Sequence, residues 1–378
     1  MTLRVAIAGA GMIAAVHADA ARRAGAEIVG LSASTPERAK AAAERLGVAR
    51  AFSSSEELVT DADVDVVHIC TPNALHSPLV RLAFEAGKHV VCEKPLALSP
   101  VDADELVQLA ADSGLVAAVP FVYRYHPMAA EARHRVRSGA IGEVRLIHGH
   151  YLQDWLSTPA DNNWRVDPVA GGPSRAFADI GSHWCDLVEW VSGHRIQELT
   201  ASAQTVIGAR STVSAATFAA AADGGEGDEG TLATVSTEDA VQVVFRTGQG
   251  AGGSLVVSQV SPGRKNSLWF EIDGAQLSVS FDQEKPETLL LGGRERTEIL
   301  NRDALSAEAA RHNSTPAGHP LGYRDCFAAF VSDVYEAVRA PEFGAAPRYP
   351  TFADAARTAH ITDAVLRSAQ SRTWIEVS

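Results

Sequence analysis

Two polar side chains in different halves of the chain have the chemistry that hydride transfer from an alcohol requires. Lys94 follows a predicted strand that ends near Cys92, and His183 lies four residues after Asp179. Oxidation of a carbinol needs a base for the hydroxyl proton and a positive charge beside the developing alkoxide, whereas a cofactor takes the hydride. A lysine can polarise the oxygen or take the proton, and a histidine can act as acid or base. A lone lysine after a strand is usually just solvated, and the flanking Glu93 and Pro95 favour a role in the chemistry here.

The spacing of Asp179 and His183 places both on one face of a predicted helix, and Asp186 adds a third polar group. A carboxylate there can orient the imidazole and stabilise its protonated form. Aspartate and histidine at this spacing can also chelate a metal ion, but a third and a fourth ligand are not evident, so no metal is predicted. A helix N-cap at Asp179 beside a surface His183 is the remaining alternative.

A glycine turn near the N-terminus predicts a nucleotide site. The segment Gly9-Ala10-Gly11-Met12-Ile13-Ala14 fits G-x-G-x-x-G/A and stands between an apolar run and a helical pattern. The first glycine allows a tight turn, the second lets the backbone approach a pyrophosphate, and the helix N-terminus supplies N–H donors. We therefore expect this turn to bind the pyrophosphate of a dinucleotide.

The end of the second predicted strand bears on which dinucleotide binds. NAD sites usually carry an acidic residue there for the ribose hydroxyls, but the sequence from residue 31 to 35 has no carboxylate. Ser32, Ser34 and Arg38 supply hydroxyls and a cation that suit a 2′-phosphate. Both NAD and NADP remain possible cofactors, and the residue types slightly favour NADP. Simple turn and cap roles for these residues are the alternative.

The elements that position these side chains alternate between strand and helix up to about residue 121. Strands are predicted at 3–8, 27–31, 64–70, 89–92 and 115–121, and helices at 12–24, 37–46, 77–86 and 100–113. Such alternation implies a parallel sheet with both faces covered. Beyond residue 122 short β patterns punctuated by Gly and Asp predict an α+β domain with an open, predominantly antiparallel sheet. Residues 208–230 are predicted to form a mobile hairpin loop rather than a linker between domains, and late helices are expected at 325–338 and 352–368.

Length and charge limit the class of protein. The chain has 378 residues, more than one hydrophobic core usually serves, so two domains are expected. Its 46 acidic and 33 basic residues give a net charge of −13, which disfavours nucleic acid and membranes as partners. The four cysteines form no C-x-x-C pair, and Gly9 and Gly11 interrupt the apolar N-terminal stretch that otherwise resembles a secretion signal. We expect a cytoplasmic protein with a small-molecule partner.

Further motifs stand in a characteristic order after the glycine turn. They are Thr71-Pro72-Asn73-Ala74-Leu75-His76, Glu93-Lys94-Pro95, Tyr123-Arg124-Tyr125-His126-Pro127, Trp164-Arg165 before Gly171-Gly172, Asp179 to Asp186, and Glu238-Asp239. In this order they resemble the glucose–fructose oxidoreductase / inositol dehydrogenase / MocA (Gfo/Idh/MocA) family over essentially the whole chain. The resemblance implies an α/β Rossmann domain at 1–122, with residues 350–378 packing back on it, and a substrate-binding and oligomerisation α+β domain at 123–349.

The same resemblance implies roles for individual residues. It places Thr71, Asn73 and His76 along the cofactor and Glu93 and Lys94 at the nicotinamide end. It also implies a cis Lys94–Pro95 peptide and a homodimer or homotetramer formed through the second-domain sheet.

The expected activity is hydride transfer between NAD(P) and a secondary alcohol or ketone of a sugar, sugar derivative or cyclitol. Our hypothesis gives acid–base chemistry to His183 and Lys94, without dividing the roles, and substrate binding or orientation of His183 to Asp179. Arg124, Trp164, Arg165 and Tyr323 are candidate substrate-binding residues, with simple junction packing as the alternative. Two other activities stay open, namely NAD-dependent glycoside cleavage and non-catalytic ligand sensing. The substrate, the direction of reaction and the oligomer size are not predicted.

Overall fold

The computed structural model describes residues 2–212, 231–303, 305–340 and 346–378. Its contacts divide the chain into two compact units. Unit 1 comprises Met1–Tyr125 and Gly322–Ala359, and unit 2 comprises His126–Leu321 and His360–Ser378. The domain limits expected from the sequence, a boundary at 122 and the return of 350–378 to the first domain, stay a prediction.

Unit 1 is built on a five-stranded sheet of order β2-β1-β3-β4-β5 in which every pair is parallel. The strands are β1 (Arg4–Ala8), β2 (Glu27–Ser32), β3 (Val66–Ile69), β4 (His89–Cys92) and β5 (Ala117–Ala118). Most of their residues are buried, since helices cover both faces of the sheet. The predicted doubly covered parallel sheet is therefore confirmed.

The helices of unit 1 form two layers. One core cluster joins Val5 and Ile7 of β1 to α1 (Met12–Arg23), α2 (Pro36–Leu46) and α10 (Tyr323–Arg339). The other joins the opposite face to α3 (Ser55–Thr60), α4 (His76–Glu85), α5 (Pro100–Ser113) and the first residues of α11 (Phe352–Ser371). Short 3-10 turns, η1 (Asn73–Leu75) and η2 (Val122–Tyr125), complete the unit.

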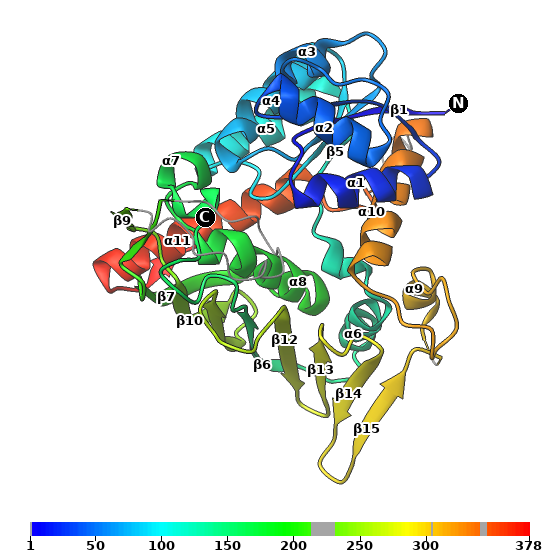
Figure 1. The fold of residues 1–378 in the computed structure, drawn as a ribbon. Helices are drawn as coiled ribbons and strands as arrows, with labels where there is room; N and C mark the ends of the chain where they lie inside the picture. The colour runs from blue at the N-terminus through cyan, green and yellow to red at the C-terminus, as the bar shows by residue number, and fades with distance from the viewer. Residues whose placement is uncertain (1, 213–230, 304, 341–345) are drawn as a thin grey trace. The chain divides into compact units, whose positions relative to one another are not determined.

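Local sequence explains where several of these helices begin and end. The side chains of Thr35, Ser54 and Ser99 cap α2, α3 and α5, and Gly47 and Gly114 end α2 and α5 in the left-handed conformation. The sequence predicted α2 and α5 from these signals but missed α3. The late helix α10 packs along α1 (Figure 1), so a segment from the far end of the sequence closes one face of the unit.

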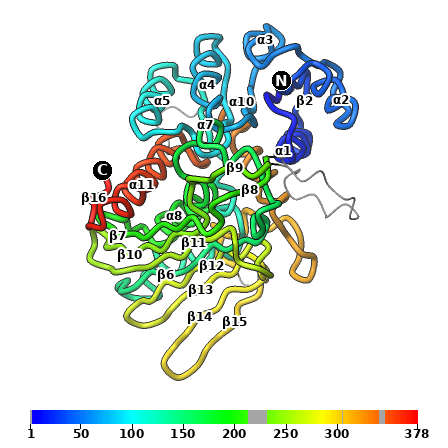
Figure 2. Tube along the Cα trace, turned by 60° about the vertical axis from the view of Figure 1, so that its left-hand side comes forward, coloured from blue at the N-terminus to red at the C-terminus, as the bar shows by residue number. Residues whose placement is uncertain are grey.

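Unit 2 contains a nine-stranded open sheet, which Figure 2 lets the reader follow from strand to strand. Its order is β15 (Thr297–Asn301), β14 (Thr288–Gly292), β13 (Ser278–Asp282), β12 (Ser267–Gly274), β6 (Val144–Leu152), β11 (Gly252–Ser258), β10 (Ala240–Thr247), β7 (Ile196–Gln204) and β16 (Ile375–Glu376). Only the β6–β11 pair is parallel among these strands. The predominantly antiparallel sheet predicted from the sequence is therefore confirmed.

One face of this sheet is covered by helices. Helix α6 (Pro127–Arg137) contacts strands β13 and β14, and helix α8 (Ser182–Ser192) contacts strands β6 and β12. Alternate strand residues such as Val243 and Phe245 are buried, while Val244 between them is 49% exposed. This period-two pattern is what a sheet with one covered face requires.

Smaller elements complete unit 2. They are η3 (Trp164–Val166), α7 (Pro168–Gly171), the π-helical turn η4 (Phe177–Gly181), α9 (Ala307–Ala310), and the paired strands β8 (Ala209–Ser211) and β9 (Leu232–Thr234). The predicted loop at 208–230 thus begins in a strand, and its residues 213–230 lie outside the described residues. Among the described helices, none has the length and apolar character needed to cross a membrane.

Candidate active site

The glycine turn has the geometry of a phosphate-binding loop. Gly9 has φ of +116°, and its N–H donates to the Ser32 carbonyl at 3.0 Å. A Cβ at position 9 would overlap the Cys70 carbonyl, so a larger residue cannot fit there. At position 11, by contrast, a Cβ would meet no atom of the described chain within 4 Å apart from its own residue, its chain neighbours and the adjoining helix backbone, and no side chain caps α1. The helix N-terminus is therefore open to an anionic group beside Gly11.

The residues that follow Gly11 are less buried. Met12 is 47% exposed and Ile13 is half-buried at the start of α1, whereas Ala14 is fully buried against the sheet. The arrangement leaves room beside the turn and packs the third motif position closely, as the fingerprint requires.

The end of β2 divides its polar residues between the core and the surface. Ser32 is fully buried, and its hydroxyl bonds to that of Ser55 at 2.9 Å. Ser34 and Arg38 are exposed, and Arg38 Nη1 donates to the Ser34 hydroxyl at 3.1 Å. The carboxylate of Glu37 bonds to its own backbone N–H and to Thr35, which lowers its pKa. The exposed edge thus presents a guanidinium and a hydroxyl.

The loop after β3 is tied to the loop after β4. His76 is buried, and its ring nitrogens lie 2.7 Å from the Pro95 carbonyl oxygen and 2.9 Å from that of Thr71. Burial lowers the pKa of His76, and these two carbonyl contacts oppose that shift. Thr71 and Asn73 are 8% exposed, and within the described chain the Thr71 hydroxyl has no hydrogen-bond partner. His76 therefore holds the Thr71 turn against the Lys94–Pro95 segment, whose peptide is cis as the resemblance implied.

The Glu93 carboxylate ends a chain of buried hydrogen bonds. Its Oε1 lies 3.1 Å from Nε2 of His17, and its Oε2 accepts from the Lys94 backbone N–H at 3.2 Å. Nδ1 of His17 lies 2.7 Å from Nδ1 of His68, whose Nε2 lies 2.9 Å from the Tyr335 hydroxyl. The two histidines and Tyr335 are fully buried, and burial followed by the proximity of His17 holds the pKa of His68 well below its usual value.

In unit 2 the Asp179 carboxylate is held by two side chains. Its Oδ1 lies 3.3 Å from Nε of Arg165, and its Oδ2 accepts from Gln259 Nε2 at 2.8 Å. The Arg165 guanidinium stacks on the Trp164 ring, 4.4 Å from its centroid, and donates to Asn163 Oδ1. Trp164 and Arg165, both predicted as pocket residues, are therefore brought together with Asp179.

His183 and Asp186 lie on α8, just after the π-helical turn that carries Asp179. The sequence predicted one continuous α-helical face, but η4 widens the turn because its bonds span five residues instead of four. His183 is 8% exposed and Asp186 5%, so a surface His183 beside an N-cap aspartate is excluded. The His183 ring lies 6.5 Å from that of Tyr151, centroid to centroid.

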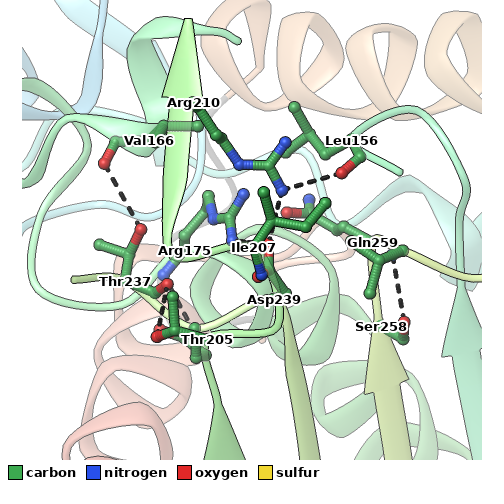
Figure 3. A network of polar contacts seen from close by, with 12 residues as sticks. Leu156, Val166, Arg175, Thr205, Ile207, Arg210, Thr237, Asp239, Ser258 and Gln259 are labelled. Carbon is green, nitrogen blue, oxygen red and sulfur yellow. Dashed lines mark hydrogen bonds and ion pairs between the residues drawn. The ribbon is translucent and has the colours of Figure 1, made fainter. Parts of the chain in front are cut away.

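A buried charged network includes Arg175, which lies two residues before the η4 turn. Arg175 and Arg210, both buried, converge on Oδ1 of Asp239 (Figure 3), with Arg210 Nη2 at 2.7 Å. Burial raises the pKa of Asp239, but the Ile207 N–H and the two arginines together lower it below its usual value. We call these three residues the Arg–Asp–Arg network.

Glu238, the neighbour of Asp239, caps the segment that enters η4. Its Oε1 accepts from the Ser174 hydroxyl at 2.7 Å and from the N–H groups of Arg175 and Phe177 at 3.0 Å. Gln259 joins the same region, since its N–H donates to the Asp239 carbonyl at 3.0 Å. The pair Glu238-Asp239 thus orders the backbone that presents Asp179.

Two predicted substrate-binding residues lie in unit 1. Arg124 Nη2 pairs with Asp354 Oδ1 at 2.9 Å, near the start of α11. Tyr323 begins α10, where its ring packs against Tyr123 and Phe327 at centroid distances of 6.2 and 5.7 Å. Their roles in binding substrate stay predictions, as do those of the other residues named above.

Sequence reasoning missed several residues that hold the predicted ones. His17, His68 and Tyr335 reach Glu93, and Gln259 reaches Asp179. The histidine in the otherwise apolar strand β3 was a usable signal, because a buried imidazole needs polar partners. Gln259 follows a strand like many surface residues and gave no such signal.

A group of three possible metal ligands lies elsewhere in the described part of the chain. His148, Glu271 and Asp273 stand on the open sheet face, with His148 Nε2 3.7 Å from Glu271 Oε1 and 3.4 Å from Asp273 Oδ2. They are half-buried, and such groups of polar side chains are common on protein surfaces without a metal ion.

Family models cover most of the chain. A model described as "Oxidoreductase family, NAD-binding Rossmann fold" matches residues 3–121, and one described as "GFO/IDH/MocA C-terminal domain" matches residues 129–280. Among curated proteins, the levoglucosan dehydrogenase of Pseudarthrobacter phenanthrenivorans is 31% identical over 361 residues, covering 92% of this chain and 88% of that protein.

Solved structures are similar over the full length. A levoglucosan dehydrogenase in complex with NADH and L-sorbose superposes with a TM-score of 0.89 at 28% identity, covering 100% of this chain and 99% of that one. An inositol dehydrogenase homologue from Azotobacter vinelandii, complexed with NAD+, gives a TM-score of 0.88 at 26% identity, covering 100% and 97%.

Proposed function

Because the chain belongs to the glucose–fructose oxidoreductase / inositol dehydrogenase / MocA family, we propose that it oxidises or reduces a sugar, sugar derivative or cyclitol at a secondary carbon. It is an oxidoreductase with an NAD-binding Rossmann domain. The relatives described above are dehydrogenases, which favours this reaction over glycoside cleavage or ligand sensing.

One observation carries the proposal. The glycine turn follows β1 and Lys94 follows β4, and β3 lies between these strands in the sheet. Neighbouring strands are spaced about 4.8 Å apart, so the two features stand about 10 Å from each other along the same carboxyl edge. That span suits a dinucleotide whose pyrophosphate lies at Gly11 and whose nicotinamide end lies at Lys94.

The residues at this edge fit a nicotinamide dinucleotide, which when bound supplies the site that takes or gives the hydride. Lys94 holds the reacting oxygen and assists its proton transfer. His183 acts as acid or base at the same oxygen, and Asp179 binds substrate hydroxyls or orients His183. Arg165 and Gln259 fix the Asp179 carboxylate through one oxygen each, which limits its movement.

A panel of sugars and polyols, read at the nicotinamide absorbance band, tests the proposal. We expect turnover with at least one of them, and a loss of about 100- to 10,000-fold in Lys94→Ala and in His183→Ala with dinucleotide affinity retained. Lys265→Ala, which alters a lysine with 78% side-chain exposure, is the matched control. Full activity in either site variant would contradict the assignment.

For the adenosine end we propose a modest preference for NADP(H), supported by the exposed Ser34 and Arg38 and by the engagement of Glu37 with its own helix. The NADH and NAD+ complexes of similar structures are the observation against it. Parallel titrations decide, and Arg38→Ala should weaken NADP(H) binding while leaving NAD(H) binding unchanged. Much tighter NAD(H) binding by the unaltered protein would overturn this preference.

We also propose that the open sheet face of unit 2 forms a homodimer or homotetramer contact. Strand pairing places exposed apolar side chains on this one face, namely Leu146, Val244, Val256, Leu290 and Ile299. Light scattering should show an oligomer that Val244→Asp with Val256→Asp dissociates. A monomeric unaltered protein would contradict the contact. For its location we propose the cytoplasm, because all four cysteines are buried free thiols, as is usual in a reducing compartment.

A further inference from the structure

Four side chains of unit 1 form a single hydrogen-bonded chain that the proposed mechanism does not use. It runs from Tyr335 on α10, through His68 on β3 and His17 on α1, to Glu93 after β4. The contacting residues are 51 to 267 positions apart in sequence, so only the packing of α1 on the sheet and of α10 on α1 brings them together.

Counting donors determines how the protons lie along this chain. The Tyr335 hydroxyl donates to Nε2 of His68, which leaves the His68 proton on Nδ1. His68 Nδ1–H then donates to Nδ1 of His17, and the remaining His17 proton, on Nε2, donates to Glu93 Oε1. Both rings are neutral, every contact has one donor and one acceptor, and the last acceptor is an ionised carboxylate.

The other proton arrangements leave a buried group unsatisfied. If His17 Nδ1–H donated to His68, then His68 Nε2–H would donate to the Tyr335 oxygen, and the Tyr335 hydroxyl hydrogen would have no acceptor in the described chain. The Tyr335 hydroxyl hydrogen is likewise left without an acceptor if His17 carries both protons. Burial also raises the pKa of Tyr335, which keeps its hydroxyl protonated as the first donor. A buried donor without a partner is costly, so the first arrangement is favoured.

The end of the chain lies beside the proposed reaction centre. Glu93 Oε1 accepts from His17 and Oε2 accepts from the Lys94 backbone N–H, so both oxygens are engaged by groups of unit 1. The carboxylate is thereby held between the ring of His17 and the peptide N–H of Lys94.

We propose that His17 and His68 are positioning residues that keep the Glu93 carboxylate ionised and aimed at the Lys94 peptide. The Tyr335 hydroxyl donates the first hydrogen bond of this chain. This inference rests on the proposed function, in which Glu93 and Lys94 lie at the nicotinamide end. His17 and His68 then contact Glu93 directly or through each other, and they contact neither cofactor nor substrate. They act through Glu93 alone, and their effect is on the placement of Lys94.

The proton arrangement can be measured without activity. Nitrogen-15 NMR of histidine-labelled full-length protein should show His68 as the Nδ1–H tautomer and His17 as the Nε2–H tautomer. His17→Gln and His68→Gln assign the signals. A His17 imidazolium, or the reversed tautomers, would overturn the chain.

Two isosteric variants of His17 test the positioning. Gln can place a donor where Nε2 of His17 stands, whereas Asn can replace only the acceptor at Nδ1. Each variant loses one buried contact, so both should melt at similar temperatures. We expect His17→Asn to lower kcat by about tenfold to a hundredfold, since that is the effect of a lost hydrogen bond to a charged group. His17→Gln should stay within about threefold of the unaltered protein, because it keeps that hydrogen bond.

The outcomes separate this inference from the proposed function. Equal losses of kcat in the Asn and Gln variants would show a merely structural histidine and overturn the positioning role. Absence of turnover in the unaltered protein would contradict the proposed function instead, and the tautomer measurement would still confirm or overturn the chain.

Discussion

Each unit buries one polar network next to its candidate site residues, and the two networks are built on opposite principles. In unit 1 the chain from Tyr335 to Glu93 passes through two imidazoles, and only its last member is ionised in the arrangement derived above. In unit 2 the Arg–Asp–Arg network places two guanidinium groups on one carboxylate (Figure 3).

The difference teaches what each network can tolerate. Neutral hydrogen bonds depend on which ring nitrogen carries the proton, so a change of tautomer or protonation reverses them. A buried group of charges instead depends on the balance of charge, because removing one partner leaves the others desolvated and unpaired. We expect the stability of the first network to respond to mildly acidic pH, below about 6.5, and that of the second to respond to mutation.

The largest effect should come from Asp239→Ala. Two buried arginines lose their common carboxylate, and breaking a buried pair in this way costs about 3 to 5 kcal/mol. Urea denaturation measures the loss. Glu298→Ala, which removes the partner of Arg296 on a largely exposed hairpin, is the control and should cost under about 1 kcal/mol. Similar losses in the two variants would remove the charge-balance explanation.

The next effect concerns the first donor of the unit 1 chain. Tyr335→Phe removes the hydroxyl and leaves Nε2 of His68 buried without its donor, for a cost of about 1 to 3 kcal/mol. Tyr349→Phe is the control, because within the described residues its partly buried hydroxyl has no hydrogen-bond partner. If both tyrosine variants unfold at the same urea concentration, the hydroxyl of Tyr335 contributes nothing to the free energy of unfolding.

Acid should weaken the two networks in different pH windows. The folded pKa of His68 lies well below 6.5, so the unfolded chain binds more protons below that pH, and stability falls as pH drops under about 6.5. The folded pKa of Asp239 lies below 3.8, so its contribution is present above that value and is lost only as pH falls through it.

Hydrogen exchange resolved by peptide can separate these windows. Peptides from α10 should lose protection between pH 6.5 and 5, with a slope of at most about 1.4 kcal/mol per pH unit from His68, while peptides from β10 keep theirs. His68→Gln should reduce that slope relative to the unaltered protein. Parallel loss of protection in both segments would contradict the contrast.

The smallest effect tests how the unit 2 network reaches the site. Gln259→Leu removes the N–H donor to Asp179 but keeps the backbone bond to Asp239, so stability should change by about 1 kcal/mol or less. Turnover should fall by about fivefold, as one hydrogen bond would allow. Unchanged turnover would mean that Gln259 does not position Asp179 for the reaction.

Local signals in the sequence determined the parallel sheet and the glycine turn of unit 1. Apolar runs, N-cap hydroxyls and C-terminal glycines act over a few residues, so they predicted β4 and α5 with the observed bounds. The same reasoning missed α3, and it expected one α-helix where η4 forms a π-helical turn at Asp179. The pair Glu238-Asp239 was recognised only as part of a resemblance, without its capping role.

The sequence by itself thus determined the two-part architecture, the nucleotide turn, and the identities of Lys94, Asp179 and His183 as candidates. Only the tertiary structure decided which side chains hold them. Glu93 meets His17 across 76 residues, and His68 meets Tyr335 across 267. The periodicity of a strand or a helix is set by near neighbours, whereas such contacts depend on how α1 packs on the sheet and α10 packs against α1. Buried polar groups then take whichever partners that packing supplies.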